Sequence, residues 1–240
     1  MELRLDLHIH SHHSPDGVLT LSEIASRARE AGLHGVAVCD HDRVLPEAER
    51  AAAFPGLLLI PGVEVSTDAG HLLGWFVTEP VRARTLPEAV AEIHAQGGIA
   101  VLAHPFEHTK RPERAEQALP YVDGIEVWNS RADRKNRQAN AMARAFAAAH
   151  AVRGFAGSDA HTRHEIGNGV TVARADAPTP EAVRAALLSG DVRTEGRRSK
   201  AVWTAVSQYA RRRKRGAGPL SYVKWAAFAV KCVLEDLFRP

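Results

Sequence analysis

Near its start the chain contains the sequence LRLDLHIHS, residues 3–11. The apolar pattern over residues 3–9 predicts a β-strand. Successive side chains of a strand point to opposite faces, so His8 and His10 are expected on the same face at its carboxyl end. Two imidazoles side by side at a buried strand end are typical of a metal-ligand pair. Taken alone, the two residues are also compatible with a solvated or hydrogen-bonded pair.

Beyond this segment, short apolar runs alternate with helical patterns. Alternation at this spacing implies parallel βαβ units, and therefore an α/β layer or barrel. The predicted strands lie at residues 3–9, 35–39, 57–60, 71–77, 99–103, 124–128 and 152–156, and the predicted helices at residues 21–31, 86–96, 134–150 and 180–189.

Residues of metal-ligand type recur directly after the apolar runs. Because the carboxyl ends of parallel strands meet at one end of an α/β fold, we expect these side chains to lie together. Histidine and carboxylates without cysteine favour zinc, manganese or iron over a structural thiolate site. Glu126 is the least determined member, since it is suited to ligating, to orienting a ligand or to capping a strand. The set is His8, His10, His41, Glu64, His104, Glu126, Asp159 and His161.

The composition is that of an ordinary globular protein. Of 240 residues, 45% are hydrophobic and 25% are charged, which excludes wholesale disorder and collagen-like repeats. Cys39 and Cys232 are far apart, so no disulfide framework is expected and a cytoplasmic location is predicted. Residues 1–6 lack the basic and apolar regions of a signal peptide. No stretch of about 18 apolar residues occurs, so we expect no transmembrane segment.

The net charge of +3 hides two parts of opposite charge. Residues 193–240 contain 12 Lys and Arg against 3 Asp and Glu, a balance of +9, whereas residues 1–192 contain 19 against 25, a balance of −6. We therefore predict an acidic domain at residues 1–195 and a basic helical tail at residues 196–240.

A basic run, RRRKR at residues 211–215, separates two apolar helical stretches of the tail at residues 201–210 and 220–238. Three roles remain open for it. The tail is suited to docking on the domain as a helical hairpin. Alternatively, it is suited to peripheral association with an anionic membrane surface, or to attracting nucleic acid or a nucleotide.

Six short motifs of the predicted domain resemble, in order, those of the PHP (polymerase and histidinol phosphatase) family. The resemblance covers roughly residues 1–195 and implies an α/β fold, a distorted (β/α)7 barrel, with up to three metal ions at the carboxyl ends of the strands. The basic helical tail would then be a C-terminal extension of the barrel. The motifs are DLHIHS at 6–11, SPDG at 14–17, DHD at 40–42, PGVE at 61–64, AHP at 103–105 and GSDAH at 157–161.

The resemblance also implies a ligand set, carried over position by position. Asp16 stands where some family members have histidine, so it leaves the metal identity open. His71 is carried over from the segment after Glu64, which varies in the family. The first metal ion would be held by His8, His10, Glu64 and Asp159, the second by Glu64, His71 and His104, and the third by Asp16, His41 and His161.

Such a cluster predicts a metal-dependent phosphoesterase, with two or three divalent ions of manganese, zinc or iron as cofactors. A hydroxide bridging two ions is a nucleophile at neutral pH, and the ions neutralise the charge that develops on phosphate oxygens. The expected substrate is a small phosphomonoester, a nucleotide or a short oligonucleotide. The alternatives are a histidinol-phosphate phosphatase and a non-catalytic metal-binding module that serves a partner protein.

Further residues are candidates for supporting roles. Asp6, Asp40 and Asp42 flank ligand histidines and are expected to accept their free N–H groups, which would fix each ring. Arg131 and Arg163 are candidates for binding substrate phosphate in a bidentate manner. Solvated loop carboxylates and surface arginines are the alternatives at these positions.

Overall fold

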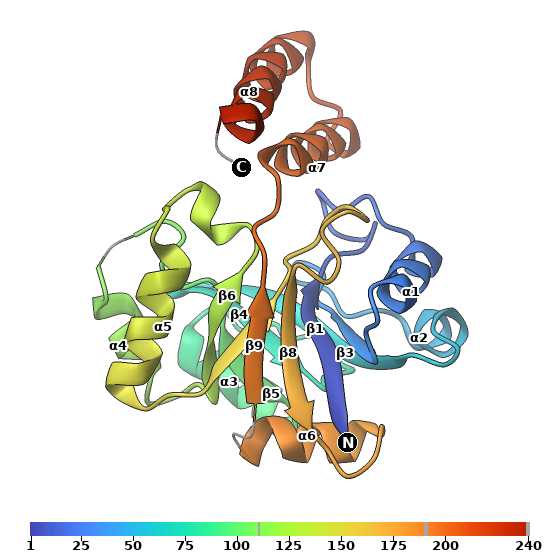
Figure 1. The fold of residues 1–240 in the computed structure, drawn as a ribbon, viewed down its shortest axis with the longest axis vertical. Coiled ribbons are helices and arrows are strands. Elements are labelled where there is room, and N and C mark those ends of the chain that lie inside the picture. The colour runs from blue at the N-terminus through green and yellow to red at the C-terminus, as the bar shows by residue number, and fades with distance from the viewer. Residues whose placement is uncertain (110, 190–191, 239–240) are drawn as a thin grey trace.

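The computed structural model describes residues 1–109, 111–189 and 192–238 (Figure 1). Within these residues the strands form one sheet of nine strands. They are β1 (Glu2–Ile9), β2 (Gly35–Val38), β3 (Leu58–Thr67), β4 (Gly70–Trp75), β5 (Ile99–Leu102), β6 (Gly124–Asn129), β7 (Gly154–Gly157), β8 (Gly169–Arg174) and β9 (Val192–Gly196).

The sheet order is β7-β6-β5-β4-β3-β2-β1-β8-β9, and the sheet curls into a nearly closed barrel. Its two ends meet, because β7 packs against β1, β8 and β9, and Ile9 forms a parallel bridge with Ala160 beyond β7. Only β4 and β8 run against the other described strands. The predicted α/β barrel is therefore confirmed, with the carboxyl ends of its parallel strands at one mouth.

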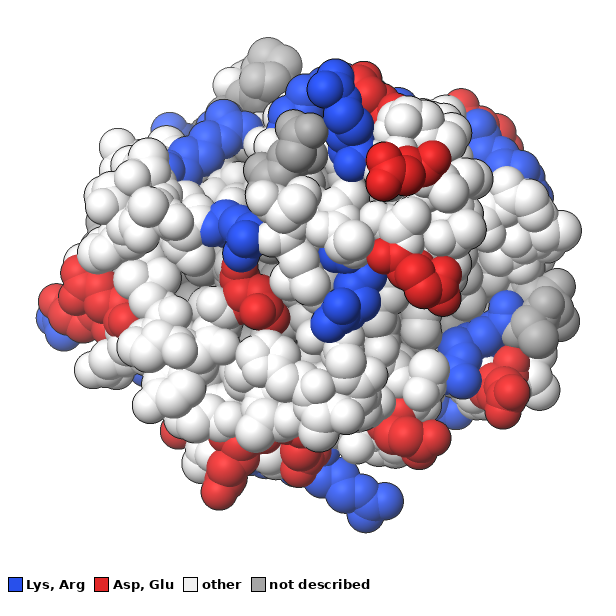
Figure 2. All heavy atoms as spheres, turned by 90° about the horizontal axis from the view of Figure 1, so that it is seen from below, with Lys and Arg blue, Asp and Glu red and all other residues white. Residues whose placement is uncertain are grey.

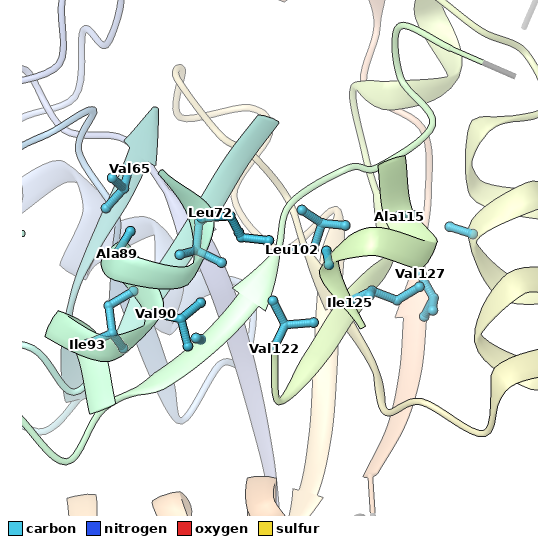
Figure 3. Packing of buried hydrophobic residues seen from close by; sticks show 14 of the residues in the cluster. Val65, Leu72, Ala89, Val90, Ile93, Leu102, Ala115, Val122, Ile125 and Val127 are labelled. Carbon is cyan, nitrogen blue, oxygen red and sulfur yellow. The ribbon is translucent and has the colours of Figure 1, made fainter. Parts of the chain in front are cut away.

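Helices cover the outside of this barrel. The apolar faces of α3 and α4 pack on β4, β5 and β6, where Leu72, Ile93 and Ile125 are completely buried (Figure 3). Because the helices cover the sides of the barrel, the carboxyl ends of the strands and their polar side chains lie at its mouth. The helices are α1 (Leu21–Glu30), α2 (Glu47–Ala53), α3 (Leu86–Ala95), α4 (Glu113–Ala118), α5 (Ala139–His150) and α6 (Pro180–Ser189), with one 3-10 turn, η1 (Ala132–Arg134).

The main differences from the predicted elements are local. The helix expected over residues 134–150 begins only at Ala139, because the Asp133 carboxylate accepts a hydrogen bond from the backbone of Asn140 and side-chain bonding of this kind favours helix starts. The short elements α2, α4, β8 and β9 were not predicted. Strand β3 runs on to Thr67 and forms an antiparallel hairpin with β4, which the apolar run at 57–60 did not indicate.

The C-terminal residues form an antiparallel helical hairpin of α7 (Ala201–Lys214) and α8 (Pro219–Phe238) above the mouth of the barrel (Figure 1). The basic run was expected between two helices, but it forms the last turn of α7, since Arg and Lys are strong helix formers and are favoured at carboxyl ends. The Asp236 carboxylate caps the start of α7 by accepting from the backbone of Ala201 at 2.6 Å and Val202 at 2.9 Å.

The last residues of the predicted tail, Arg239 and Pro240, lie outside the described residues. Among the helices that the structure describes, none combines the length and the apolar character needed to cross a bilayer.

Candidate metal centre

Eight of the nine predicted ligands form three groups at the mouth of the barrel, two of which share His10. Within each group, one potential ligand atom from every residue lies within 4.8 Å of the others. The ninth residue, Asp16, borders the third group, with its Oδ1 3.3 Å from Nε2 of His161. The groups are His8, His10 and Asp159; Glu64, His71 and His104; and His10, His41 and His161.

Different strands bring these residues together. The end of β1 carries His8 and His10, as the alternation of its side chains predicts. The β3–β4 hairpin explains His71: it pairs with Ser66, two residues from Glu64, and its Nδ1 lies 2.8 Å from Glu64 Oε1. His104 and Asp159 follow β5 and β7 with positive φ values of 28° and 54°, backbone conformations that are costly for residues other than glycine.

The electrostatics of the cluster are dominated by burial and opposite charges. Burial lowers the pKa of His10 to about 3, and the charges of His161 and His41 add to this effect. Burial also opposes a charge on His41 and His104, but the Glu64 carboxylate raises the pKa of each to about 9. Burial alone would raise the pKa of Glu64, yet the rings around it hold that pKa well below its usual range. An ionised carboxylate therefore sits at the centre of the cluster.

Several ligand-type atoms have no hydrogen-bond partner within the described residues. They are Asp16 Oδ1, Glu64 Oε2 and His71 Nδ1, all buried. Their nearest polar neighbours are other ligand-type atoms of the cluster: His41 Nδ1 lies 2.8 Å from Glu64 Oε2, Glu64 Oε1 lies 2.8 Å from His71 Nδ1, and His161 Nε2 lies 3.3 Å from Asp16 Oδ1. Buried polar atoms are nearly always hydrogen-bonded, so unpartnered oxygen and nitrogen atoms converging on one space indicate a cation site. The donor set of imidazoles and carboxylates fits divalent zinc, manganese or iron.

A second layer of residues orients the first two histidines. Glu126 Oε1 lies 2.9 Å from His8 Nδ1, so a proton shared there leaves the His8 Nε2 lone pair facing the cluster. Ser14 Oγ lies 3.0 Å from His10 Nδ1 and donates to Asp40 at 2.6 Å. Of the roles left open for Glu126, the contacts support orientation.

The three aspartates do not act as expected, because none accepts an N–H from a ligand ring. Asp6 accepts from the backbone of Ser158 and Gly167 and thereby fixes the loop after β7, and burial raises its pKa to about 6. Asp42 accepts from the backbone and hydroxyl of Ser66. Asp40 reaches a ligand only through a serine hydroxyl. The prediction of direct contacts is corrected in all three cases, since backbone N–H groups and hydroxyls lie nearer to these carboxylates.

The two predicted phosphate-binding arginines are also corrected. Arg131 borders the cavity described below, but its guanidinium forms a buried bidentate pair with Glu165, with both N–O distances 2.6 Å, and donates to Ser207 of α7 at 3.3 Å. Arg163 lies in a separate surface hollow, 3.9 Å from Glu30. Arg131 is therefore a structural bridge between barrel and hairpin, and Arg163 does not reach the cluster.

A cavity of about 660 Å³ lies over the cluster. Seven of the predicted ligands line it, whereas His8 and His10 are fully buried beneath them. The hairpin supplies another part of the wall, which the sequence did not indicate. Its lining residues are Thr204, Gln208, Arg211, Arg212, Arg215 and Phe228.

The hairpin is docked on the barrel by polar contacts. Lys214 Nζ donates to the carbonyl oxygens of His12, Ser14 and Gly17 at 2.6–2.7 Å, in the loop that carries Asp16. Of the three roles considered for the tail, docking is the one these contacts support. Four of the five side chains in the basic run line the cavity or contact this loop.

Histidines and carboxylates that converge at the carboxyl ends of the strands of an α/β barrel are typical of metal-dependent enzymes. The family is established by its sequence patterns: the PHP domain matches residues 6–143, and the PHP-associated pattern matches residues 137–192. The chain belongs to the PHP family and is a metal-dependent phosphoesterase.

Relatives by sequence agree with this assignment. An uncharacterised protein of Methanocaldococcus jannaschii is 32% identical over 179 residues, which cover 69% of this chain and 68% of that protein. A 3',5'-nucleoside bisphosphate phosphatase of Chromobacterium violaceum is 42% identical over 76 residues, 29% of this chain and 26% of that protein. A 5'-3' exoribonuclease of Haemophilus influenzae is 47% identical over 70 residues, 28% of this chain and 25% of that protein.

Solved structures support the fold. A two-domain protein of Bacteroides vulgatus with a PHP-like metal-dependent phosphoesterase has a TM-score of 0.66 at 19% identity, covering 88% of this chain and 70% of that chain. The lesion-specific endonuclease Q of Pyrococcus furiosus has a TM-score of 0.59 at 19% identity, covering 81% of this chain and 58% of that chain. At these identities the likeness shows the fold alone.

Proposed function

We propose that this phosphoesterase hydrolyses phosphomonoesters of nucleotide size or at the end of a short oligonucleotide. The observation that carries the proposal is the convergence of nine ligand-type side chains beneath one cavity, with three of their atoms buried and unpartnered within the described residues. A cavity of about 660 Å³ falls in the range of small-molecule sites. The nucleoside bisphosphate phosphatase among the relatives supports a nucleotide phosphomonoester as substrate. The exoribonuclease, which cleaves phosphodiester bonds, supports only the binding of an RNA end.

We further propose that two or three divalent ions occupy the cluster. The assignment follows the three spatial groups and gives Glu64 the bridging position, because its two oxygens face different histidines: Oε1 faces His71 and His104, and Oε2 faces His10 and His41. The proposed first set is His8, His10, Glu64 and Asp159, the second is Glu64, His71 and His104, and the third is Asp16, His41 and His161.

Bound divalent ions supply an activated water and positive charge for the phosphate oxygens. The chain's own residues prepare the site for this chemistry. Glu126 holds the ring of His8, Ser14 and Asp40 hold that of His10, and Asp6 fixes the loop that carries Asp159. The hairpin forms one wall of the cavity over the cluster.

A screen of manganese-loaded protein tests the proposal, with released phosphate measured for every substrate and the length of short RNA also followed by gel electrophoresis. The substrates are nucleoside monophosphates, nucleoside bisphosphates, histidinol phosphate and short RNA. We expect turnover of nucleotides or RNA ends, loss of turnover in His8→Ala, and no change in His150→Ala, a histidine exposed at the end of α5. Preferential turnover of histidinol phosphate would replace the nucleotide class, and no turnover of any substrate by protein that binds metal would indicate a non-catalytic module.

A further inference from the structure

The last turn of α7 brings guanidinium groups into the cavity that contains the proposed metal cluster. Arg211 and Arg215 line this cavity together with Asp16, His41 and Glu64. The barrel side of the cavity contains the ligand-type side chains together with Arg131, Arg134 and Lys135, and the hairpin side adds the basic side chains of Arg211, Arg212 and Arg215. A phosphoester bound at the cluster would extend toward the hairpin, because the barrel closes the other side.

These guanidinium groups are not neutralised by the protein. Within the described part of the chain, neither Arg211 nor Arg215 lies within 4.0 Å of a carboxylate oxygen. Arg211 Nε is buried and has no hydrogen-bond partner there. A buried N–H without an acceptor is destabilising, so this donor favours an acceptor that enters the cavity from outside the chain.

The neighbouring Arg212 differs from Arg211 and Arg215, because its guanidinium group forms hydrogen bonds within the hairpin. Its Nη1 donates to the backbone oxygen of Gln208 at 2.8 Å, and its Nε donates to Ser221 at 3.2 Å. Arg212 is therefore used to join the two helices of the hairpin. Arg211 and Arg215 form no side-chain hydrogen bonds of this kind among the described residues.

The position of α7 is fixed, which a binding wall requires. Lys214 is held by three carbonyl oxygens of the loop 12–17, and Arg198 pairs with Asp133 at 2.9 Å. At the start of the hairpin, Ser199 Oγ lies 2.6 Å from Ser130 Oγ. The contacts of Lys214 hold the last turn of α7, and the other two hold the segment before α7 on the barrel.

The basic wall is a local feature and does not reflect a uniformly basic surface. Figure 2 shows the face of the molecule away from the hairpin, where basic and acidic side chains are intermixed. An anion that enters the cavity thus meets a concentration of positive charge that this opposite face does not offer. Guanidinium groups bind phosphate through charge-assisted and often bidentate hydrogen bonds.

We propose that Arg211 and Arg215 form a second phosphate-binding subsite, which binds a phosphate of the substrate other than the one hydrolysed at the cluster. The proposal rests on the proposed function and narrows it: the preferred substrates carry a second phosphate, as nucleoside bisphosphates and the ends of short oligonucleotides do. The hairpin is then a specificity element of the enzyme.

Binding of non-hydrolysable ligands tests the subsite without requiring turnover. Manganese-loaded protein is titrated calorimetrically with α,ω-alkane bisphosphonates of increasing chain length and with the matching alkyl monophosphonates. We expect one chain length to bind at least about tenfold more tightly than its monophosphonate. This advantage should largely disappear in Arg211→Gln and in Arg215→Gln, and Arg211→Lys should restore part of it because the charge remains.

The matched control is Arg213→Gln, which removes the same charge from an exposed residue of the same turn that does not line the cavity. It should keep the advantage within twofold. Thermal unfolding of each variant separates misfolding from loss of the subsite. Equal affinity of the wild type for bisphosphonates and monophosphonates at every chain length, or an equal loss in Arg213→Gln and Arg211→Gln, would overturn the proposal.

A kinetic measurement distinguishes failure of the subsite from failure of the proposed function. The kcat/KM for adenosine 3',5'-bisphosphate is compared with that for adenosine 5'-monophosphate, and the ratio should fall about tenfold or more in Arg211→Gln. If the wild type releases phosphate from neither nucleotide nor any other phosphoester, the proposed function fails, whereas the calorimetric result still decides the subsite. If it releases phosphate and the ratio is unchanged in Arg211→Gln, only the subsite fails.

Discussion

Glu126 Oε1 lies 2.9 Å from Nδ1 of His8, and both side chains are almost completely buried. His8 Nε2, on the other side of the ring, lies 3.7 Å from both Asp159 Oδ1 and Glu64 Oε2. The carboxylate of Glu126 thus fixes which nitrogen of His8 faces the cluster. The same carboxylate accepts the backbone N–H of His104 at 2.9 Å through its other oxygen. One residue that is not a proposed ligand therefore positions two that are.

Replacing this orienting carboxylate should weaken metal binding while leaving the fold intact. We expect Glu126→Gln to lower the affinity for manganese by about 10–100-fold, the range typical of residues that orient a ligand. Competition with a fluorescent chelator measures the affinity. Glu116→Gln, on the outer helix α4, is the control and should bind as the wild type. Equal affinity in all three proteins would show that Glu126 does not orient His8.

Metal loading should release protons, and its strength should rise with pH. In the metal-free protein, burial opposes the charge of His41 and His104, but Glu64 raises the pKa of each to about 9, so both are protonated at pH 7. A divalent ion must displace these protons, and the competition disappears as the pH rises through about 9. Calorimetry in buffers of different ionisation enthalpy counts the released protons. Loading without proton release at pH 7 is inconsistent with ligation by these two rings.

Lys214 should matter for the loop that carries Asp16. Its ammonium group holds three carbonyl oxygens of residues 12–17, so Lys214→Met should free this loop and the end of α7. We expect the ion proposed at Asp16, His41 and His161 to bind about tenfold less tightly. We also expect the hairpin to become sensitive to limited proteolysis. Lys224→Met on the exposed side of α8 is the control. Unchanged proteolysis in Lys214→Met would mean that the contact does not hold the hairpin.

The corrected role of Arg131 predicts a loss of stability. Removing one partner of a buried ion pair leaves the other charge uncompensated, and Glu165 is completely buried. Arg131→Met should therefore lower the free energy of unfolding by about 3–5 kcal/mol, measured by urea denaturation. If Arg131 contacted the substrate instead, the variant would unfold like the wild type and only its KM would rise.

The parts of the site that follow strand periodicity could be predicted from the sequence. His8 and His10 share a face because they are two residues apart in a strand, and Asp159 and His161 repeat this spacing after β7. Placing ligands at the carboxyl ends of parallel strands needs only the order of the apolar runs. His71 could not be placed from the apolar pattern, because its approach to Glu64 depends on the β3–β4 hairpin. The family resemblance was needed to predict it as a ligand.

Contacts between distant segments were not predictable in the same way. Arg131 and Glu165 are separated by 34 residues, and no local pattern distinguishes an arginine that binds a buried carboxylate from one that faces a ligand. The same holds for Asp6, which accepts from Ser158 and Gly167 across the barrel. The basic run of the tail was evident from its composition, but its position over the cavity depends on the docking of α7.

The central proposal is that phosphate release requires divalent ions bound by the cluster that contains Asp159. Measuring phosphate release with and without metal, and with and without the Asp159 carboxylate, tests it directly. The rate of phosphate release from adenosine 3',5'-bisphosphate is measured for the wild type as loaded, after chelation, and after reloading with manganese, and for Asp159→Asn under the same conditions. We expect loss of turnover on chelation, recovery on reloading, and a decrease of at least about 100-fold in loaded Asp159→Asn. Turnover that survives both chelation and the loss of the Asp159 carboxylate would contradict it.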